Sequence, residues 1–464
     1  MEDFRMSDFN AFEIKMRAAG MGDAPIAVFR RNYEALLRNE TGMIPEESIE
    51  PARDLPKAEG FGERGNSELL GQTVVLKLNG GLGTGMGLQT AKSLLPVREG
   101  VNFLDLMVKQ ILRLRRESGE NVRLLLMNSF STSEDTLNHL SQYAQHDLSS
   151  PDEVELMQNM IPKIDAETLA PVEWPTDPEQ EWCPPGHADI YPALVGSGWL
   201  EKLLAEGVNY AFVSNSDNLG ATLDPKLLGF FAESGAPFMM EVTRRTAADK
   251  KGGHLAKRKS DGRLLLREVA QCADEDLGEF QNIDKHRYFN TNNIWLNLKK
   301  LKVQLAADSG VLPLPMIRNK KTVDPRDPDS PPVIQLEIAM GSAIECFDGA
   351  IGLEVPRSRF APVKTTSDLL ALRSDAYEVL EDGTVKLREE RSGVPPDVSL
   401  SSEYKLVDAL DLLGVPSLIG CSSLKVNGSI AFDKGVIIEG DVAFENQSSE
   451  CKAIPAGTYK DGSF

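Results

Sequence analysis

Apolar runs alternate with amphipathic segments through the middle of the chain. Residues 73–78, 122–127 and 210–213 are short apolar runs of the kind that form buried strands, and residues 102–117 carry apolar side chains at helical spacing. Strands that alternate with helices are typical of a largely parallel sheet. The pattern therefore predicts an α/β domain with a mixed, mainly parallel sheet over residues 71–370.

The first 70 residues have a different pattern, which predicts a small helical lobe. Phe29, Tyr33, Leu36 and Leu37 fall at i, i+4, i+7 and i+8, so they share one face of a helix. Prolines and acidic residues then separate this helix from the first strand. We expect an N-terminal helical lobe over residues 1–70.

The last part of the chain contains a six-residue repeat. Two apolar series have this period, and glycines at positions 428 and 440 fit it. The two series are Leu424, Ile430, Val436 and Val442, and Val426, Phe432, Ile438 and Phe444. A hexad repeat is typical of a left-handed parallel β-helix, which we expect over residues 371–464. An irregular antiparallel meander is the alternative, but the agreement of two series favours the β-helix.

Polar residues follow two of the predicted strands at the points where those strands end. Asn128 and Ser129 come after the second strand, and residues 214–218, which read S-N-S-D-N, follow the third. The carboxyl ends of parallel strands lie at one edge of a sheet, and open α/β sheets bind ligands there. We therefore expect a binding site at this edge.

The segment that follows the first strand is the strongest functional signal. Residues 77–93 read K-L-N-G-G-L-G-T-G-M-G-L-Q-T-A-K-S, with five glycines in eight residues and a lysine and a serine at the end. Glycines let backbone N–H groups approach a ligand without a Cβ in the way, and such N–H groups suit phosphate. The loop predicts a nucleotide site, and a purely structural glycine-rich turn is the alternative.

Two common nucleotide-binding motifs do not fit this loop. A Walker A loop needs glycines where Met86 and Ala91 stand. A dinucleotide fingerprint needs a glycine where the chain has Met86 or Leu88. The failed fingerprint disfavours a hydride-transfer oxidoreductase.

Charge and cysteine content narrow the choice of partners and compartment. The 464 residues carry a net charge of −20, which repels nucleic acids and anionic membranes, so neither is an expected partner. The same field repels a nucleoside triphosphate, so a nucleotide site needs local lysines or a metal ion. The five cysteines are widely spaced, the N-terminus is polar, and no apolar run approaches the roughly 18 residues of a membrane helix. These features predict a cytoplasmic protein with reduced thiols.

Six segments carry recognisable motifs in a fixed order. They are the glycine loop, read as L-N-G-G-L-G-T-x-M-G-x-x-x-x-K-S, and residues 127–130, 182–191, 212–222, 289–293 and 356–369. In these segments the chain resembles the UDP-glucose pyrophosphorylase (UTP–glucose-1-phosphate uridylyltransferase) family. The family usually has proline where Ala91 stands and glycine where Ala188 stands, and neither difference removes a charged or hydrogen-bonding side chain.

The resemblance implies a nucleotidyltransferase with a Rossmann-like, GT-A-like central domain. It would make UDP-glucose and pyrophosphate reversibly from UTP and glucose 1-phosphate, with Mg²⁺. An oxygen of the sugar phosphate attacks the α-phosphorus of UTP in line with the leaving pyrophosphate. That oxygen is already anionic at neutral pH, so the reaction needs no strong general base. It needs cations and N–H groups that align two anions and stabilise the developing charge.

The resemblance gives the central roles to Lys92, Lys364 and Asp217. Lys92 would contact the UTP phosphates and assist departure of pyrophosphate, and Lys364 would be the second phosphate-binding, catalytic lysine. Asp217 would hold Mg²⁺, which nucleotide sites bind through one or two carboxylates, phosphate oxygens and water. From the residues alone, either lysine could be a simple surface residue, and Asp217 could close an Asx-turn or cap a helix.

A second group of residues would bind UTP, by the same resemblance. This group consists of Leu78, Asn79, Gly80, Gly81, Gln158 and Gly186. Leu78, Gly80 and Gly81 would line the uracil, and Gly186 would lie against it through its backbone. Gln158 would read an edge of the base, since an amide offers a donor and an acceptor together. Without the resemblance, Gln158 reads as a solvated helix residue.

A third group would bind glucose 1-phosphate. The resemblance puts His187, Asn215 and Ser216 at the sugar phosphate, and Glu268, Asn292 and Asn293 at the glucose hydroxyls. Imidazole can donate a hydrogen bond to phosphate whether neutral or charged. From the residues alone, His187 could cap the next segment, the asparagines could form turns, and Glu268 could be a strand-surface carboxylate.

Three alternative functions differ in their sequence signals. UDP-N-acetylhexosamine pyrophosphorylases tend to a G-G-Q-G-T-R-L-G loop, with arginine where Gly85 or Met86 stands here, so the loop favours glucose. A broad-specificity UDP-sugar pyrophosphorylase is harder to separate. A non-catalytic nucleotide-sugar sensor or scaffold could use the β-helix for self-association. The presence of Lys92, Asp217 and Lys364 favours an enzyme over a sensor.

Overall fold

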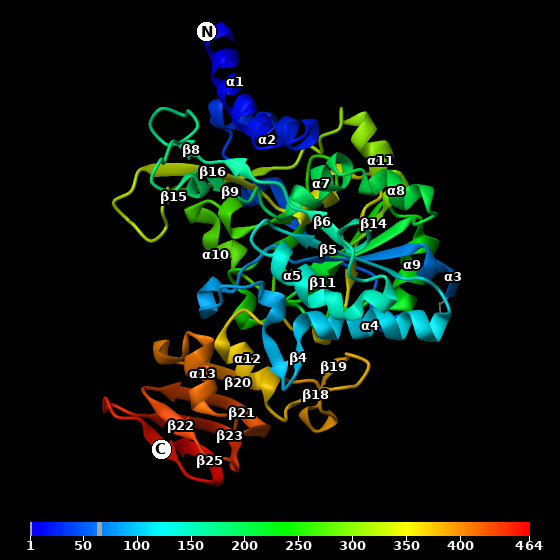
Figure 1. Cartoon of the computed structure of the whole chain (residues 1–464). Helices are drawn as coiled ribbons and strands as arrows, with labels where there is room; N and C mark the ends of the chain where they lie inside the picture. The colour runs from blue at the N-terminus through cyan, green and yellow to red at the C-terminus, as the bar shows by residue number, and fades with distance from the viewer. Residues whose placement is uncertain (1, 63–66) are drawn as a thin grey trace.

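A ten-stranded mixed sheet forms the centre of the described part of the chain, residues 2–62 and 67–464 of a computed structural model (Figure 1). Its strands are β1 (Ile49–Pro51), β2 (Thr73–Leu78), β5 (Arg123–Asn128), β6 (Glu155–Met157), β10 (Tyr210–Asn215), β11 (Phe238–Arg244), β12 (His254–Arg258), β13 (Leu264–Arg267), β14 (Tyr288–Asn297) and β17 (Ile351–Glu354). The main order is β1-β12-β14-β10-β2-β5-β6, and strands β10, β2, β5 and β6 are parallel. The prediction of an α/β fold with a mixed sheet and a parallel centre is confirmed.

The central strands are buried on both faces, which explains their continuous apolar runs. In β2, Val75 packs into one core with Phe212 of β10 and Trp295 of β14. The neighbouring Val74 and Leu76 point to the opposite face and belong to a second core. Since side chains alternate along a strand, apolar residues at every position require cover on both faces.

Helix α4 (Phe103–Ser118) covers one of these faces and has clear sequence signals at both ends. Asn102 accepts from the N–H of Asp105 and Asp105 accepts from the N–H of Asn102, which forms a capping box. Gly119, at φ 75°, ends the helix in the left-handed region. The predicted helix, residues 102–117, agrees within one residue. The other helices of six or more residues beside the sheet are α5 (Ser133–Leu140), α7 (Ile190–Gly196), α8 (Trp199–Ala205), α9 (Pro225–Ser234) and α11 (Leu298–Ala307).

Helices α1 (Glu2–Ala18) and α2 (Asp23–Leu37) form the N-terminal end. Phe29, Tyr33 and Leu36 of α2 are buried, as their helical spacing predicts, and they pack with Phe9 and Phe12 of α1. The same core includes residues of a small antiparallel sheet made of β8 (Ile164–Asp165), β15 (Met316–Thr322) and β16 (Pro332–Ile338). Later in the first 70 residues, β1 pairs with β12 at the edge of the central sheet.

The C-terminal region lies at the end of the molecule opposite the N-terminus, and the antiparallel pair of β18 (Tyr377–Val379) and β19 (Val385–Leu387) precedes its two parallel sheets (Figure 1). Their strands are β20 (Asp397–Leu400), β21 (Ser417–Asn427), β22 (Ile430–Phe432), β23 (Val436–Glu445), β24 (Lys452–Ile454) and β25 (Gly457–Ser463). Both apolar hexad series are buried, and Leu424 stands beside Val442 in parallel register. Every pairing in these two sheets is parallel, which excludes the antiparallel meander.

The C-terminal core also contains part of the glycine loop. Met86 is buried in this core, and Leu88 packs against it. Leu406 lies so close to Gly87 that a Cβ on the glycine would be 3.1 Å from Leu406 Cδ2. The glycine loop and the C-terminal region therefore share one apolar contact surface.

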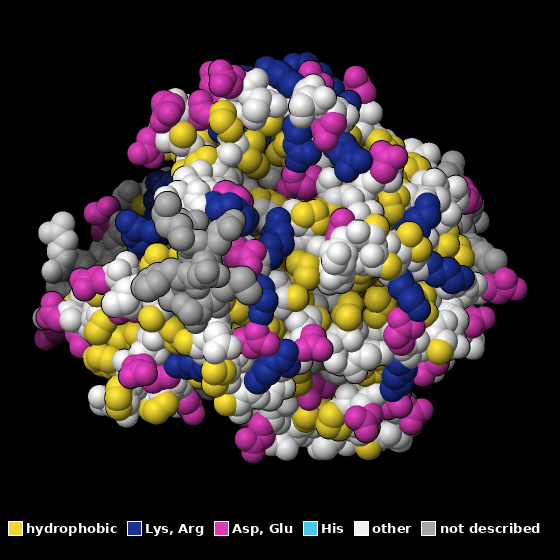
Figure 2. All heavy atoms as spheres, turned by 90° about the horizontal axis from the view of Figure 1, so that it is seen from above, with side chains coloured by type: hydrophobic (Ala, Val, Ile, Leu, Met, Phe, Trp, Pro, Cys, Tyr) yellow, Lys and Arg dark blue, Asp and Glu magenta, His cyan; other side chains and the backbone are white. Residues whose placement is uncertain are grey.

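The surface carries charges of both signs. On the face shown in Figure 2, Lys and Arg side chains are interspersed with Asp and Glu side chains. Across residues 2–62 and 67–464, none of the helices combines the length and apolar character needed to cross a bilayer. All five cysteines are free thiols, and four of them are buried.

Candidate active site

The glycine loop leaves the end of β2 and is anchored on the end of β5. Asn79 is 1% exposed, and its Nδ2 donates to Asn128 Oδ1 at 2.7 Å and to Thr136 Oγ1 at 3.0 Å. In the part of the chain that the structure describes, the N–H groups of Gly80 and Gly81 have no hydrogen-bond partner. These two N–H groups are available to a ligand. The Nδ2 group of Asn79 holds the loop in place, so the predicted contact of Asn79 with UTP would have to come from its other atoms.

Gly80, Gln158 and Gly186 lie together at the side of this loop. A Cβ on Gly80 would be 2.6 Å from Gln158 Oε1, and Gln158 Nε2 donates to the carbonyl oxygen of Gly186 at 3.3 Å. Gly186 has φ 86°, and a Cβ there would be 2.5 Å from the carbonyl oxygen of Ile338, so only glycine fits. Leu78, which ends β2, is partly buried beside them. The residues predicted to bind uracil are therefore close enough to form one pocket wall.

His187 follows Gly186 and is held as a neutral ring. Its Nδ1 accepts a hydrogen bond from the N–H of Met340 at 2.9 Å. Burial lowers the pKa of His187 to about 4, so the ring is uncharged at neutral pH. Since Nδ1 is an acceptor, the proton of the neutral ring is on Nε2. That N–H is the group that could donate to a phosphate oxygen.

Asp189 fixes this segment beside Gln158. It belongs to the G-H-A-D motif, but the sequence analysis did not single it out. It accepts from the N–H of Asn159 at 2.6 Å and from Asn159 Nδ2 at 3.0 Å. Burial raises the pKa of Asp189 to about 6, and the hydrogen bonds from Asn159 oppose that rise. This buried pair keeps the two halves of the pocket wall together.

A substitution at His187 can test the roles of its two ring nitrogens separately. His187→Asn is expected to keep an acceptor for the N–H of Met340 and to lose the Nε2–H donor, because asparagine Oδ1 mimics Nδ1. We expect KM for the sugar phosphate to rise by about 10- to 100-fold, since one hydrogen bond to a charged group contributes about 1.5–3 kcal/mol. Steady-state kinetics with varied sugar phosphate measure this, and an unchanged KM would remove His187 from that contact. The wild-type kcat should show no titration of His187 between pH 6 and 9.

Lys92 and Asp217 form an ion pair at the centre of the site. Lys92 Nζ and Asp217 Oδ2 are 2.7 Å apart, and both side chains are 17% exposed. The N–H of Lys92 bonds to the carbonyl oxygen of Gly81 at 3.1 Å, so the lysine folds back over the glycine loop. The second carboxylate oxygen, Asp217 Oδ1, is buried and has no hydrogen-bond partner among the residues that the structure describes. A buried carboxylate oxygen with free lone pairs suits a hard cation such as Mg²⁺.

Asn215 and Asn292 meet beside this ion pair. Asn292 Nδ2 donates to Asn215 Oδ1 at 2.8 Å, while Asn292 Oδ1 is buried and has no partner within residues 2–62 and 67–464. Asn292 has φ 61°, an unusual conformation for a non-glycine residue that marks a bend in β14. Ser216 lies next to Asn215 and its N–H bonds to the carbonyl oxygen of Leu78. The free Asn292 Oδ1 is an acceptor that a sugar hydroxyl could fill.

Asn293 differs from the prediction that it binds glucose. It is 0% exposed. Its Nδ2 donates to Glu241 Oε2 at 3.0 Å and to the carbonyl oxygen of Arg359 at 3.3 Å, and its Oδ1 accepts from Asn218. Both amide hydrogens are used by the protein, so we expect Asn293 to hold its neighbours rather than contact the sugar.

Lys364 approaches the site from a separate segment. Its neighbour Val363 donates its N–H to the carbonyl oxygen of Asp217 at 3.0 Å, which brings the two segments side by side. Lys364 is exposed, and across the described residues its ammonium has no ion-pair partner within 4.0 Å. Burial raises the pKa of Glu268, and the positive charge of Lys364 partly offsets that rise. Lys364 and Glu268 are therefore close enough to interact.

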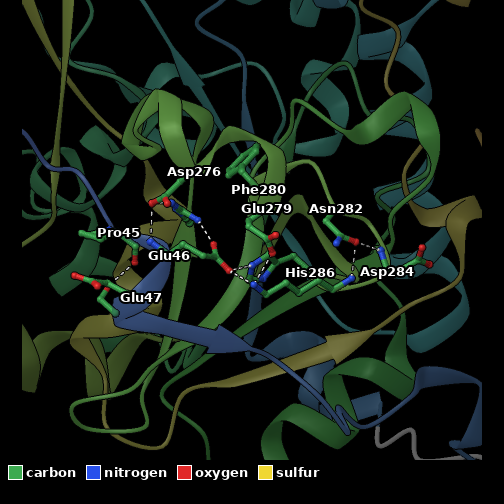
Figure 3. A network of polar contacts seen from close by, with 12 residues as sticks. Pro45, Glu46, Glu47, Asp276, Glu279, Phe280, Asn282, Asp284 and His286 are labelled. Carbon is green, nitrogen blue, oxygen red and sulfur yellow. Dashed lines mark hydrogen bonds and ion pairs between the residues drawn. The ribbon is translucent and has the colours of Figure 1, made fainter.

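Glu268 directly follows the hairpin β12–β13, which is anchored by a polar network (Figure 3). Arg267 is 0% exposed and forms ion pairs with Glu46 at 2.6 Å and Asp276 at 3.1 Å. His286 Nε2 lies 2.9 Å from Glu46 Oε1 in the same network. These contacts join three distant segments behind Glu268, whose own side chain accepts a hydrogen bond from the N–H of Gln271.

A buried ion pair that sequence reasoning missed lies below the site. Arg359 donates through Nε and Nη2 to the two oxygens of Glu241 at 2.8 and 2.7 Å. Glu241 also accepts from Trp295 Nε1 at 2.9 Å, so both of its oxygens are satisfied. The available signal was Glu241 itself, a single acid in the apolar run F-M-M-E-V, because a charge in such a strand needs a buried partner.

Lys77 is a further buried ionisable side chain, near the Arg359–Glu241 ion pair. It lies in β2 and donates to Ser214 Oγ at 2.8 Å and to the carbonyl oxygen of Ala221 at 2.6 Å. Burial lowers the pKa of Lys77 to about 7; the nearby Arg359 adds to this effect and Glu241 opposes it. An unfolded lysine keeps its proton up to a pH of about 10.4.

This shift predicts a pH-dependent stability. Between pH 7 and 9 the unfolded chain holds the Lys77 proton that the folded chain has lost, so the unfolded state binds more protons and stability rises with pH. Relative to Lys77→Met, which has a similar shape without the charge, the free energy of unfolding should rise by up to about 1.4 kcal/mol per pH unit. Urea unfolding of both proteins at pH 7, 8 and 9 measures this. Parallel profiles for the two proteins would contradict the prediction.

Known proteins resemble this chain over most of its length. The family model described as UTP–glucose-1-phosphate uridylyltransferase matches residues 26–439. The enzyme of that name from Solanum tuberosum is 42% identical over 421 residues, which cover 89% of this chain and 84% of the relative. The Saccharomyces cerevisiae enzyme of that name is 43% identical over 396 residues, 85% of this chain and 78% of the relative.

Solved structures agree with the sequence comparison. UDP-glucose pyrophosphorylase from Leishmania major superposes with a TM-score of 0.93 at 45% identity, covering 98% of this chain and 99% of that one. The Trypanosoma brucei structure named UDP-glucose phosphorylase gives a TM-score of 0.90 at 48% identity, with 98% and 99% covered. The chain belongs to the UTP–glucose-1-phosphate uridylyltransferase family.

Proposed function

We propose that this chain makes UDP-glucose and pyrophosphate from UTP and glucose 1-phosphate, in a reversible reaction. The relatives in plants and yeast carry the name of this activity. The observation in the structure that carries the proposal is the Lys92–Asp217 ion pair, which lies on a glycine loop at the carboxyl edge of the parallel strands. A cation and a carboxylate at this place suit a nucleotide bound as its metal complex.

The residues around this pair divide the work on the phosphates. The N–H groups of Gly80 and Gly81 and the ammonium of Lys92 neutralise the phosphates of UTP, and Lys364 stabilises the charge that develops around the α-phosphorus. The neutral His187 donates from Nε2 to the sugar phosphate and holds it in line for attack. These groups align two anions. The repulsion between those anions is the main barrier when the nucleophile is already charged.

Asp217 is the residue that would hold Mg²⁺. The fit rests on Asp217 Oδ1, the buried oxygen without a partner. Across the described residues no group of three or more His, Cys, Asp or Glu side chains gathers around a common point, so the remaining ligands would be phosphate oxygens and water. When bound, Mg²⁺ supplies positive charge that stabilises the phosphate oxygens during transfer.

The base and the sugar are recognised on opposite sides of the phosphates. Gln158, Gly80 and Gly186 offer an amide and backbone groups to the uracil edge, beside Leu78. Asn292 Oδ1 and Glu268 offer acceptors to glucose hydroxyls, with Asn215 and Ser216 next to them at the sugar phosphate. The free Asn292 Oδ1 supports this arrangement, since a buried acceptor without a partner is costly unless a ligand fills it.

Several features of the whole molecule belong to the same proposal. Within the C-terminal domain over residues 371–464, the parallel sheets from Asp397 onward and their hexads suit a left-handed β-helix, after a catalytic domain over 71–370 and a helical lobe over 1–70. The five free cysteines suit a reducing compartment, the cytoplasm. The β-helix could also mediate self-association.

Pyrophosphate release tests the proposal directly. The protein is incubated with UTP, Mg²⁺ and, separately, the 1-phosphates of glucose, galactose and N-acetylglucosamine. A strong preference for glucose 1-phosphate is the expected result. Comparable rates with galactose 1-phosphate would make the chain a general UDP-sugar pyrophosphorylase. Failure to release pyrophosphate with any sugar would overturn the proposal and favour a nucleotide-sugar sensor.

A further inference from the structure

The side chain of Asn218 connects the two segments that carry Asp217 and Lys364. Asn218 is 2% exposed and lies in the turn after β10. Its Nδ2 donates to the carbonyl oxygen of Arg359 at 3.2 Å, and its Oδ1 accepts from the N–H of Ala361 at 2.9 Å. The amide therefore bonds to two backbone groups of the second segment, on residues two positions apart.

The same two segments also meet through their backbones. Asn218 pairs with Pro362 as an isolated antiparallel bridge, and the N–H of Val363 bonds to the carbonyl oxygen of Asp217 at 3.0 Å. At Gly220 a Cβ would be 2.3 Å from a carbonyl oxygen of the facing segment, so the chains are in direct backbone contact. These contacts join residues 217–220 to residues 358–363 along a short seam, which ends one residue before Lys364.

The seam rests on the buried ion pair below it. Arg359 supplies the carbonyl oxygen that Asn218 binds, and its guanidinium is fixed by Glu241. Asn293 Oδ1 lies 3.3 Å from Asn218 Nδ2, and Asn293 Nδ2 bonds to Glu241. Both amide hydrogens and the oxygen of Asn218 are used inside the protein, which leaves no group for a substrate.

Lys364 directly follows this seam. Across the described residues its ammonium has no ion-pair partner within 4.0 Å and interacts with Glu268 only at longer range, while its N–H is bonded to Asp368 Oδ2 at 2.8 Å. The backbone position that the seam gives Lys364 therefore decides where its flexible side chain can reach. We propose that Asn218 is a positioning residue that fixes Lys364 relative to Asp217 during transfer. This inference rests on the proposed function.

A double-mutant comparison tests the inference. Asn218→Ala is expected to lower kcat by about 10²-fold, the scale expected when a catalytic group is misplaced by about 1 Å. Lys364→Ala lowers kcat further, and the double variant should match Lys364→Ala within about twofold, because groups that act as one unit are not additive. A purely structural role predicts additive losses, so a further drop of about 10²-fold in the double variant would overturn the inference. Wild-type kcat in Asn218→Ala would also overturn it.

Two further variants keep the test decisive. Asn209→Ala is the matched control, because Asn209 precedes the same strand at its other end and its Nδ2 donates to Gln72 Oε1 at 2.8 Å. We expect it to leave kcat unchanged. If Asn218→Ala does not fold, Ala361→Pro tests the same contact, since it removes the N–H that Asn218 Oδ1 accepts. It should show the same non-additivity with Lys364→Ala, and additive losses would count against the inference.

Failure of the inference is distinguishable from failure of the proposed function. If the wild-type protein releases no pyrophosphate from UTP and glucose 1-phosphate, the proposed function falls and the inference falls with it. If the wild-type protein is active and the losses are additive, the function stands and Asn218 is only structural.

Discussion

Replacing Lys364 by alanine is expected to lower kcat by about 10³-fold, the scale of losing one group that stabilises transition-state charge. The fold should remain intact, because the side chain is exposed and makes no ion pair within the described residues. Stopped or continuous assays of pyrophosphate release measure the loss. Thermal unfolding should give a midpoint close to that of the wild type.

Two companion variants sharpen this experiment. Lys425→Ala is the matched control, since Lys425 is an exposed lysine that points outward from β21. It should leave kcat unchanged. Lys364→Arg keeps the charge but not the compact ammonium, so we expect partial activity between wild type and alanine. Turnover near the wild-type rate in Lys364→Ala would remove Lys364 from the mechanism.

Replacing Asp217 by asparagine should have an effect of similar size with a different signature. We expect kcat to fall by about 10³-fold. The Mg²⁺ concentration for half-maximal rate should also rise, because an amide oxygen binds the cation less strongly than a carboxylate. The variant also leaves Lys92 without its partner at 2.7 Å. Titration of the rate with Mg²⁺ at saturating UTP measures both changes.

The control for this variant lies close by in the chain. Asp224 caps helix α9 by accepting from the N–H of Lys226, and asparagine caps helices equally well. Asp224→Asn should therefore leave both kcat and the Mg²⁺ requirement unchanged. If Asp217→Asn lowers kcat with no change in the Mg²⁺ requirement, Asp217 serves to orient Lys92 and is not the metal ligand.

The local features of this site could be predicted from sequence because their signals are continuous along the chain. The strand at residues 73–78 has the predicted bounds, since a strand buried on both faces is an unbroken apolar run. The glycine loop directly follows the end of β2, and Asp217 lies just after the end of β10. Lys92 and Asp217 are 125 residues apart, yet both follow parallel strands, so topology alone brings them to the same edge.

The supporting contacts could not be predicted, because they join residues that no local pattern connects. Arg359 and Glu241 are 118 residues apart, and nothing between them indicates that they pair. Asn292 keeps an oxygen available to a ligand, whereas the amide of Asn293 is fully used by the protein. This difference depends on a register shift beside Glu241 and on the positive φ of Asn292. A single irregular step in a strand exchanges which side chain faces the site, and sequence spacing does not reveal such a step.

The packing of Met86 and Gly87 on the C-terminal core has a consequence for the order of folding. Leu406 and the buried hexads that complete this contact are made late, after more than two thirds of the chain has been synthesised. Contacts between such distant parts of a chain form slowly, and domains made earlier tend to fold first on the ribosome. The central sheet can therefore assemble while the glycine loop still lacks its packing. Nascent chains should gain affinity for UTP only when the last part of the protein has emerged.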